Sequence, residues 1–178
     1  MKKFVLLAML IMGCAAIAND VAINGDFKKV GKTMPSGWIQ NKGKWAEPFG
    51  AIKILKLTEK GGDAENAVQI TSTTVRTEMY TTTKVPAKAG DVFEVKVDAK
   101  GTGTLIYGLY VYSEKDGWIH SNRQTAKVTG DFQEYKATIT VKDNAKKGNA
   151  GIVRVFIGAD VNSDIVVKKV EADLKNKE

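Results

Sequence analysis

Hydrophobic and polar residues alternate with a period of two along most of the chain after residue 18. Phe93, Val95 and Val97 alternate with charged residues, and the same alternation continues through 105–112 and 152–158. Successive side chains of a β-strand point to opposite faces of the sheet, so this period indicates strands. An amphipathic helical run of useful length is missing from the sequence, which therefore predicts an all-β fold.

Further candidate strands complete the pattern, and short turn signals separate them. The additional strands are expected at 51–57, 67–72, 76–83, 133–141 and 165–173, with turns at 60–63, 88–91, 115–117 and 147–149. Many short strands at regular spacing are typical of a β-sandwich or barrel. The sequence contains no Pro/Ser-rich linker, low-complexity tract or internal repeat, and about 160 residues suit one core. We therefore expect a single domain over residues 19–178.

The N-terminus has the pattern of a signal peptide over residues 1–18, with a basic start and an apolar stretch at 4–12. That stretch is shorter than the roughly 20 residues of a membrane-spanning helix, so no transmembrane span is expected. Two processing sites compete. Ala16-Ile17-Ala18 fits cleavage before Asn19, while Ile11-Met12-Gly13-Cys14 resembles a lipobox that would place a lipid anchor on Cys14. We favour cleavage before Asn19, and either site implies export to the periplasm, cell surface or medium of a bacterium.

Cysteine and charge restrict the possibilities further. Cys14 is the sole cysteine, so an intramolecular disulfide is excluded.

Removing Lys2 and Lys3 lowers the formal net charge from +7 to +5, and the remaining lysines are dispersed. Dispersed lysine is typical of a solvated surface, with attraction for acidic polysaccharides as the alternative. No nucleic-acid partner is expected, because no RNP-type motif, zinc-finger spacing or arginine stripe occurs.

Four segments, in order, resemble carbohydrate-binding modules of families four, nine and twenty-two, the CenC-like type. Asn24-Gly25-Asp26-Phe27 followed by Pro35-Ser36-Gly37-Trp38 is similar to the opening "NGDFE…PxGW" of those modules. The later segments are 85–100, which is similar to "v.aGk.Y.fsf.aK", then Thr129–Tyr135, which is similar to "tgdWqeY", and the closing strands at 151–158 and 165–170. The resemblance covers nearly all of the chain after residue 18.

The resemblance implies a galactose-binding-domain-like jelly-roll β-sandwich of two antiparallel sheets that binds a glycan or polysaccharide. Phe27 and Trp38 are expected in the core. Members commonly hold a structural calcium between an acid after the "NGDF" phenylalanine and an aspartate near the C-terminus. Lys28 and Lys168-Lys169 stand at those places here, and an ammonium cannot ligate calcium. We therefore expect no metal and no cofactor.

Sugar recognition needs exposed aromatic faces and a few fixed hydrogen-bonding groups. Strand alternation predicts such a ligand-binding platform from Tyr110, Tyr112 and Phe156, edged by Arg154, Glu94 and Lys96, with Trp118 beside it after the Asp116-Gly117 turn. The alternative is that this face is covered and its aromatic residues form a second small core. His120 and Trp45 are further candidate contacts; a lone histidine is more often an incidental surface or hydrogen-bonded residue, while Trp45 is either a core lid or a ligand contact.

The sequence does not favour catalysis. The spacing of Glu78, Glu94, Glu114 and Asp116 places no two carboxylates across a cleft as glycosidases require. Neither a nucleophile elbow nor a phosphate loop, zinc cluster or dinucleotide fingerprint occurs. Two functions remain, namely a monomeric, non-catalytic glycan-binding module, or a structural or protein-interaction sandwich that has lost sugar binding.

Overall fold

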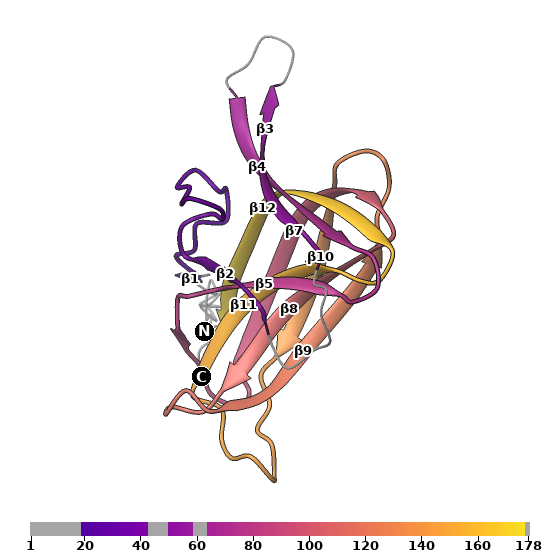
Figure 1. Cartoon of the computed structure of the whole chain (residues 1–178). Coiled ribbons are helices and arrows are strands. Elements are labelled where there is room, and N and C mark those ends of the chain that lie inside the picture. Colours follow the sequence, from indigo (N-terminus) through magenta and orange to yellow (C-terminus); the bar gives the residue numbers. More distant parts are fainter. Residues whose placement is uncertain (1–18, 43–49, 59–63, 177–178) are drawn as a thin grey trace, which may run out of the picture.

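The computed structural model describes residues 19–42, 50–58 and 64–176 as a β-sandwich (Figure 1). The first sheet has the order β10 (Gln133–Thr140), β7 (Val92–Thr102), β12 (Ser163–Asn176), β4 (Ala64–Ser72) and β3 (Ile52–Thr58), with β1 (Asn19–Asp20) paired to β12. The second has the order β2 (Trp38–Gln40), β5 (Thr77–Thr81), β11 (Ile152–Ala159), β8 (Thr104–Tyr112) and β9 (Trp118–Lys127), with β6 (Val85–Pro86) paired to β11.

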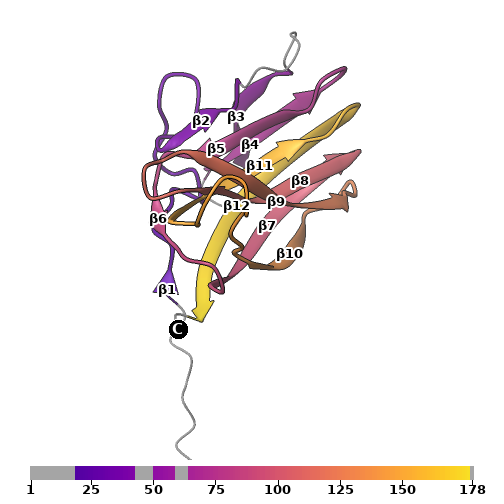
Figure 2. The ribbon, with the colours of Figure 1, turned by 90° about the horizontal axis from the view of Figure 1, so that it is seen from below.

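All strand pairs are antiparallel, and strands distant in sequence lie side by side. Strand β12 is the longest and runs through the middle of the first sheet, where it pairs with β7 and β4. Figure 2 shows β1 beside the end of β12, and Figure 1 shows the β3–β4 hairpin projecting beyond the rest of the sandwich. The predicted all-β sandwich of two antiparallel sheets is confirmed.

The core fills the space between the sheets with the inward residues of each alternating strand. Phe93, Val95 and Val97 of β7 face Leu109 and other inward residues of the second sheet, and all four side chains are fully buried. Phe27 and Trp38 close one part of this core with an edge-on ring contact of 5.8 Å between centroids. The prediction that these two aromatic residues are core anchors is confirmed.

Strands β7 and β8 are consecutive in sequence yet belong to different sheets. The chain turns between them at Gly101 and Gly103, which have φ angles of 139° and 93°. Residues other than glycine rarely adopt these φ values. In addition, a Cβ at Gly101 would lie 2.0 Å from the backbone oxygen of Asp164. The connection therefore crosses the sandwich and places the outward residues of β7 and β8 on opposite sides of the molecule.

The strands expected from alternation are all present, with ends shifted by a few residues. Strand β9 was not expected, since its sequence WIHSNRQTAK has no sustained alternation. It forms the edge of the second sheet, where only one side needs a backbone partner. Within the described residues, no helix has the length and apolar character needed to cross a membrane.

Candidate functional site

The candidate site is the outer face of the second sheet, the face that points away from the core. Backbone pairing brings Tyr110 opposite Arg154, and Tyr112 opposite both Ile152 and Trp118. Phe156 pairs with Tyr80 of β5. Paired residues of antiparallel strands point to the same side, so the predicted group of Tyr110, Tyr112, Arg154, Phe156 and Trp118 does share one face.

Part of this face is buried, which corrects the prediction of an open aromatic platform. Phe156 is fully buried and Tyr110 is 5% exposed. Their rings stack with centroids 4.3 Å apart, and Tyr80 contacts Tyr110 edge-on at 5.5 Å. The alternative of a second small core therefore holds for Tyr110 and Phe156, because rings that pack on one another leave little surface for a ligand.

A buried carboxylate organises this inner half of the face. Glu78 is 3% exposed and accepts hydrogen bonds from the Tyr110 hydroxyl, from Arg123 Nη2 at 2.7 Å and from Asn41 Nδ2 at 3.3 Å. Arg76 adds a second guanidinium, with its Nε 3.8 Å from Glu78 Oε1. A buried charge is costly unless it is paired and hydrogen-bonded, and here both conditions are met. We call Glu78, Tyr110, Arg123, Asn41 and Arg76 the Glu78 network.

Two glycines leave room for this packing. A Cβ at Gly158 would lie 2.8 Å from Cγ of Glu78 and 2.5 Å from the backbone oxygen of Thr77. Gly108, with a φ of 148°, lies beneath Phe156, and a Cβ there would approach the Phe156 ring to 3.3 Å. At Gly108 a Cβ would also lie 2.0 Å from the backbone oxygen of Asn122, so larger residues at either position would meet a neighbouring strand's backbone as well as Glu78 or Phe156.

Burial and charge raise the pKa of Tyr110. Loss of hydration is the larger cause, and the nearby Glu78 carboxylate adds to it. Burial also raises the pKa of Tyr112, against the opposing effect of Arg154. Both phenols are therefore neutral hydrogen-bonding groups at physiological pH.

The outer half of the face is partly accessible, and we call its four residues Tyr80, Tyr112, Trp118 and Arg154 the Trp118 cluster, of which the Arg154 side chain is 11% exposed. The Trp118 side chain is 52% exposed, and Tyr80 and Tyr112 are half-buried. The Arg154 guanidinium carbon lies 5.1 Å from the Tyr112 ring centroid and 5.7 Å from that of Tyr80. A cation held between two aromatic faces fixes all three side chains with little freedom.

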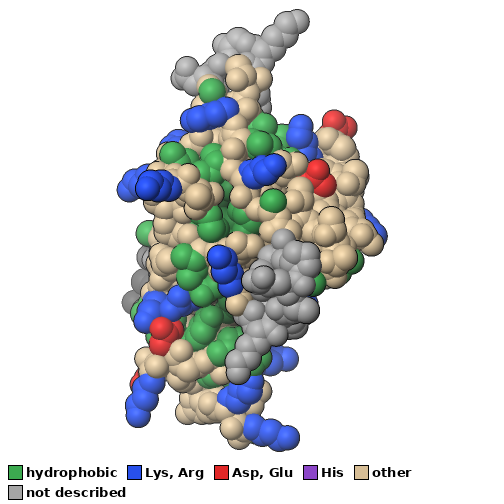
Figure 3. Space-filling model, viewed as in Figure 1, with side chains coloured by type: hydrophobic (Ala, Val, Ile, Leu, Met, Phe, Trp, Pro, Cys, Tyr) green, Lys and Arg blue, Asp and Glu red, His purple; other side chains and the backbone are tan. Residues whose placement is uncertain are grey.

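Asp116, in the turn between β8 and β9, holds Arg154 in place through an ion pair. Asp116 accepts from Arg154 Nη2 at 3.0 Å and from Lys84 Nζ at 2.8 Å. The hydrogen bond from Lys84 is the main cause that lowers the pKa of Asp116, and Arg154 contributes to it. Figure 3 shows hydrophobic side chains gathered on the side of this face where β2 and β5 lie, with lysine and arginine around them and few acidic groups in view.

The prediction that Glu94 and Lys96 join this platform is wrong. Both lie on β7 of the first sheet, because the β7–β8 connection crosses the sandwich. Glu94 pairs there with Lys175 at 3.1 Å and Lys136 at 3.3 Å, and these hydrogen bonds lower its pKa, with that from Lys175 the largest cause. Alternation within a strand shows which residues share a face, but not to which sheet the strand belongs.

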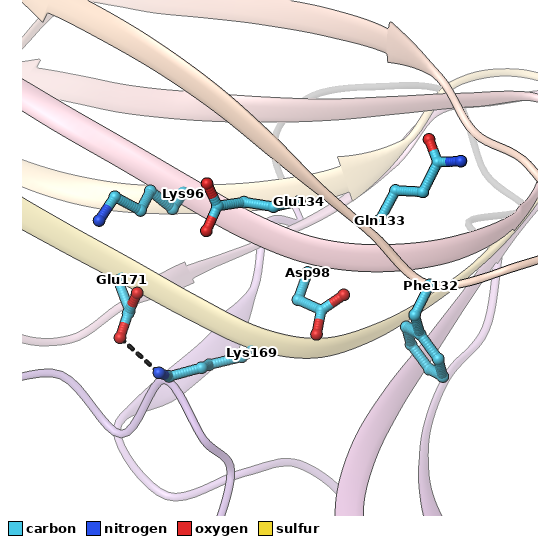
Figure 4. A pocket seen from close by; sticks show the side chains of 7 residues that line it. All are labelled: Lys96, Asp98, Phe132, Gln133, Glu134, Lys169 and Glu171. Atoms are coloured by element: carbon cyan, nitrogen blue, oxygen red, sulfur yellow. Dashed lines mark ion pairs between the residues drawn. The ribbon is translucent and has the colours of Figure 1, made fainter.

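Lys96 lines a shallow cavity of about 400 Å³ on the outer face of the first sheet (Figure 4). The cavity is bordered by strands β7, β10 and β12, and its charged residues comprise two lysines and three acids. Lys169 and Glu171 form an ion pair at its edge. The lining residues are Lys96, Asp98, Phe132, Gln133, Glu134, Lys169 and Glu171.

Lysines form ion pairs at the place where the resemblance predicts that a calcium site has been lost. Lys28 Nζ lies 2.8 Å from Asp26, and Lys168 Nζ lies 3.1 Å from Glu65. These four residues line one surface cavity of about 720 Å³. These ion pairs place ammonium groups, which cannot ligate calcium, beside the two carboxylates, and the loss of the metal stays a prediction.

Sequence reasoning missed Tyr80, Asn41 and Arg123, and considered Glu78 only as a catalytic acid. Alternation within 77–81 could have placed Glu78 and Tyr80 on the outward face of β5. Their neighbours on the inward face are Thr77, Met79 and Thr81. His120 contacts the backbone oxygen of Lys142 at 2.8 Å, a structural role, and Trp45 lies outside the described residues.

The comparisons with known proteins support the fold. No protein-family profile and no curated protein matches the chain. Solved structures do match. A family 11 carbohydrate-binding module of a cellulosomal cellulase of Clostridium thermocellum superposes with a TM-score of 0.58 at 14% identity, over 90% of this chain and 96% of that one.

The fold is a jelly-roll β-sandwich similar to that of this module. Enzymes also contain this sandwich. A cyclase from Fischerella sp. matches with a TM-score of 0.64 at 12% identity, over 90% of this chain and 98% of that one. The enzymatically active domain of tailspike protein 4 of bacteriophage CBA120 matches with a TM-score of 0.59 at 14% identity, over 87% of this chain but only 21% of that one. Identities this low establish the jelly roll, and function has to be argued from the site.

Proposed function

We propose that this protein is an exported, non-catalytic carbohydrate-binding module that recognises a polysaccharide through the Trp118 cluster. The observation that carries the proposal is an exposed tryptophan next to two half-buried tyrosines and a fixed arginine, on one sheet face of a carbohydrate-binding-module jelly roll. Sugar rings stack on aromatic faces through their C–H bonds, and a guanidinium donates to hydroxyl rims. The Trp118 cluster supplies both kinds of group.

The Glu78 network supports a binding role over a catalytic one. Glu78 is the one deeply buried carboxylate on this face among the described residues, and two arginines and the Tyr110 hydroxyl surround its oxygens. A general acid or base needs a free proton or lone pair within reach of the substrate. Glu78 instead rigidifies the sheet beneath the Trp118 cluster.

Retention on immobilised polysaccharides tests the proposal. Trp118→Ala should weaken retention of the polysaccharides that the parent protein binds about two- to twelvefold, because stacking of one ring contributes about 0.5–1.5 kcal/mol to a complex. Val161→Ala is the matched control, since Val161 is also an exposed hydrophobic residue but follows β11 at the end remote from Trp118. Equal retention of the Trp118→Ala variant and the parent would contradict the proposed site.

A second candidate function is a structural or protein-interaction sandwich, and the burial of Tyr110 and Phe156 favours it. A face whose central aromatic residues pack on one another resembles a small core more than a sugar platform. A parent protein that retains no member of a broad glycan panel, neutral or charged, would select this second candidate.

Export and processing belong to the proposal as well. We propose a mature protein that begins at Asn19, monomeric and without a lipid anchor. The intact mass of protein exported by a bacterial host tests this, because a diacylglyceryl group on Cys14 would give a longer and heavier chain.

A further inference from the structure

The segments around Trp118 carry an excess of positive charge that the strands of the first sheet do not share. The strands of the first sheet, β1 included, carry eight basic and eight acidic residues. The segments around Trp118, namely 82–84, 113–117 and 141–151 together with Arg154, carry six basic and three acidic residues. A net three of the five formal positive charges that remain without Lys2 and Lys3 therefore lie around the Trp118 cluster, and the strands of the first sheet are balanced.

Contacts bring these segments together around Trp118. Lys147 Nζ lies 3.6 Å from the centroid of the Trp118 ring, and the 141–151 loop is tied to the sheet by a hydrogen bond from Gly151 N to Tyr112 O of 2.9 Å. On the other side, Lys84 and Arg154 meet at Asp116. Basic groups thus approach the Trp118 cluster from three separate segments.

Two of the three acidic residues of these segments are engaged, Glu114 is exposed, and several lysines form no ion pair within the described residues. Asp116 is occupied by Lys84 and Arg154, and the Asp143 carboxylate accepts from Ala150 N at 2.7 Å. Lys142, Lys146 and Lys147 form no ion pair within the described part of the chain. These ammonium groups are free to meet an anionic ligand, and their charges reinforce one another there.

Lys147 has opposite effects on the two kinds of sugar: it opposes the binding of a neutral sugar to the ring and favours the binding of an anionic one. Its ammonium lies over the Trp118 face that a sugar would use, so a neutral sugar has to displace it. An anionic sugar can stack on the ring while the displaced ammonium pairs with the sugar's carboxylate or sulfate, exchanging one favourable contact for another.

We propose that the Trp118 cluster takes an anionic polysaccharide, with Trp118 stacking on a pyranose ring and Lys147 pairing with the oxyanion on that ring. This inference rests on the proposed glycan-binding function and narrows its substrate class. The shared ligand chemistry is a carboxylate or sulfate ester on a sugar ring. The cavity on the first sheet, with three acids and two lysines, has no excess of positive charge to attract such a ligand.

Matched polymers test the proposal. Affinity electrophoresis compares polygalacturonate with its methyl-esterified, uncharged form, and dextran sulfate with dextran. The parent should be retarded by a charged member of these pairs and much less by its neutral partner, and added salt should reduce the retardation. The polygalacturonate arm identifies a carboxylate ligand and the dextran sulfate arm a sulfate ligand.

Substitutions then locate the site. Lys147→Gln should weaken binding of the charged polymer about fivefold, while binding of the neutral partner is unchanged or improved because the ring is uncovered. Lys100→Gln is the matched control, since Lys100 also lies over an aromatic ring, that of Phe132 at 4.6 Å, on the first sheet. It should leave binding unchanged.

Each other result overturns the inference in a distinguishable way. Equal retardation by charged and neutral polymers refutes the anionic ligand and leaves the proposed function standing. Equal losses from Lys147→Gln and Lys100→Gln show diffuse attraction with no specific site. If the Lys147→Gln variant binds charged polymers better than the parent, Lys147 only competes with the ligand for the ring. If the parent retains no polymer at all, the proposed glycan-binding function is refuted as well.

Discussion

Replacing Tyr110 by phenylalanine tests whether the Glu78 network stabilises the fold. The substitution keeps the ring that stacks on Phe156 and removes the hydroxyl that donates to Glu78 and accepts from Asn41 Nδ2 at 2.8 Å. A hydrogen bond to a charged group contributes about 1.5–3 kcal/mol, and the site is buried, so water cannot replace the donor freely. We expect the free energy of unfolding to fall by this amount, measured by urea denaturation.

Tyr112→Phe is the matched control. Tyr112 is half-buried on the same strand, and its hydroxyl makes no hydrogen bond within the described residues, so its loss should change the unfolding free energy by less than about 0.5 kcal/mol. Equal effects of the two substitutions would refute the role assigned to the Tyr110 hydroxyl. A changed slope of the denaturation curve would instead indicate an altered unfolded or native state.

Three further predictions concern the core, the lost metal site and pH. Leu109→Ala should destabilise by about 2–5 kcal/mol in urea denaturation, because Leu109 is fully buried, and a smaller loss would mean that the inward face is misassigned. A chelator should leave the melting temperature unchanged, since Lys28 and Lys168 pair with the acids at the expected calcium position, and a drop restored by calcium would count against this. The lowered pKa of Asp116 means that its contribution to stability is present above the ordinary pKa of 3.8 and is lost as pH falls through the lower folded value. Asp116→Asn should therefore reduce the fall in melting temperature on acidification below pH 3.8, and an unchanged acid limb would refute the ion pair.

Much of the fold follows from the sequence because the inward residues of long strands such as β7 and β8 are apolar. Leu105, Leu109 and Val111 are buried as their alternation predicts, and the NGDF and PSGW turns bring Phe27 and Trp38 to the core. Strand β9 escaped prediction because an edge strand with polar residues on both faces has no periodic signal. Its identity depends on pairing with β8, which is a tertiary property.

The site was predicted less well, for two physical reasons. Outward residues of one strand are identified by alternation, yet Glu94 and Lys96 were assigned to the wrong sheet because glycines 101 and 103 turn the chain across the sandwich. Outward also does not mean exposed. Tyr110 and Phe156 are covered through contacts with Tyr80, Glu78 and Asn41, residues that are distant in sequence.

Nuclear magnetic resonance of the isotope-labelled protein, titrated with oligosaccharides of a retained polysaccharide, tests the central claim most directly. Two indole N–H signals report on it, because Trp118 is exposed in the cluster while Trp38 is buried and donates to the Asn24 backbone oxygen at 3.0 Å. We predict that the Trp118 indole signal and the amides of Tyr112 and Arg154 shift with ligand concentration, while the Trp38 signal stays in place. Shifts confined to the first sheet, around Lys96 and Lys169, would contradict the assignment of the binding face.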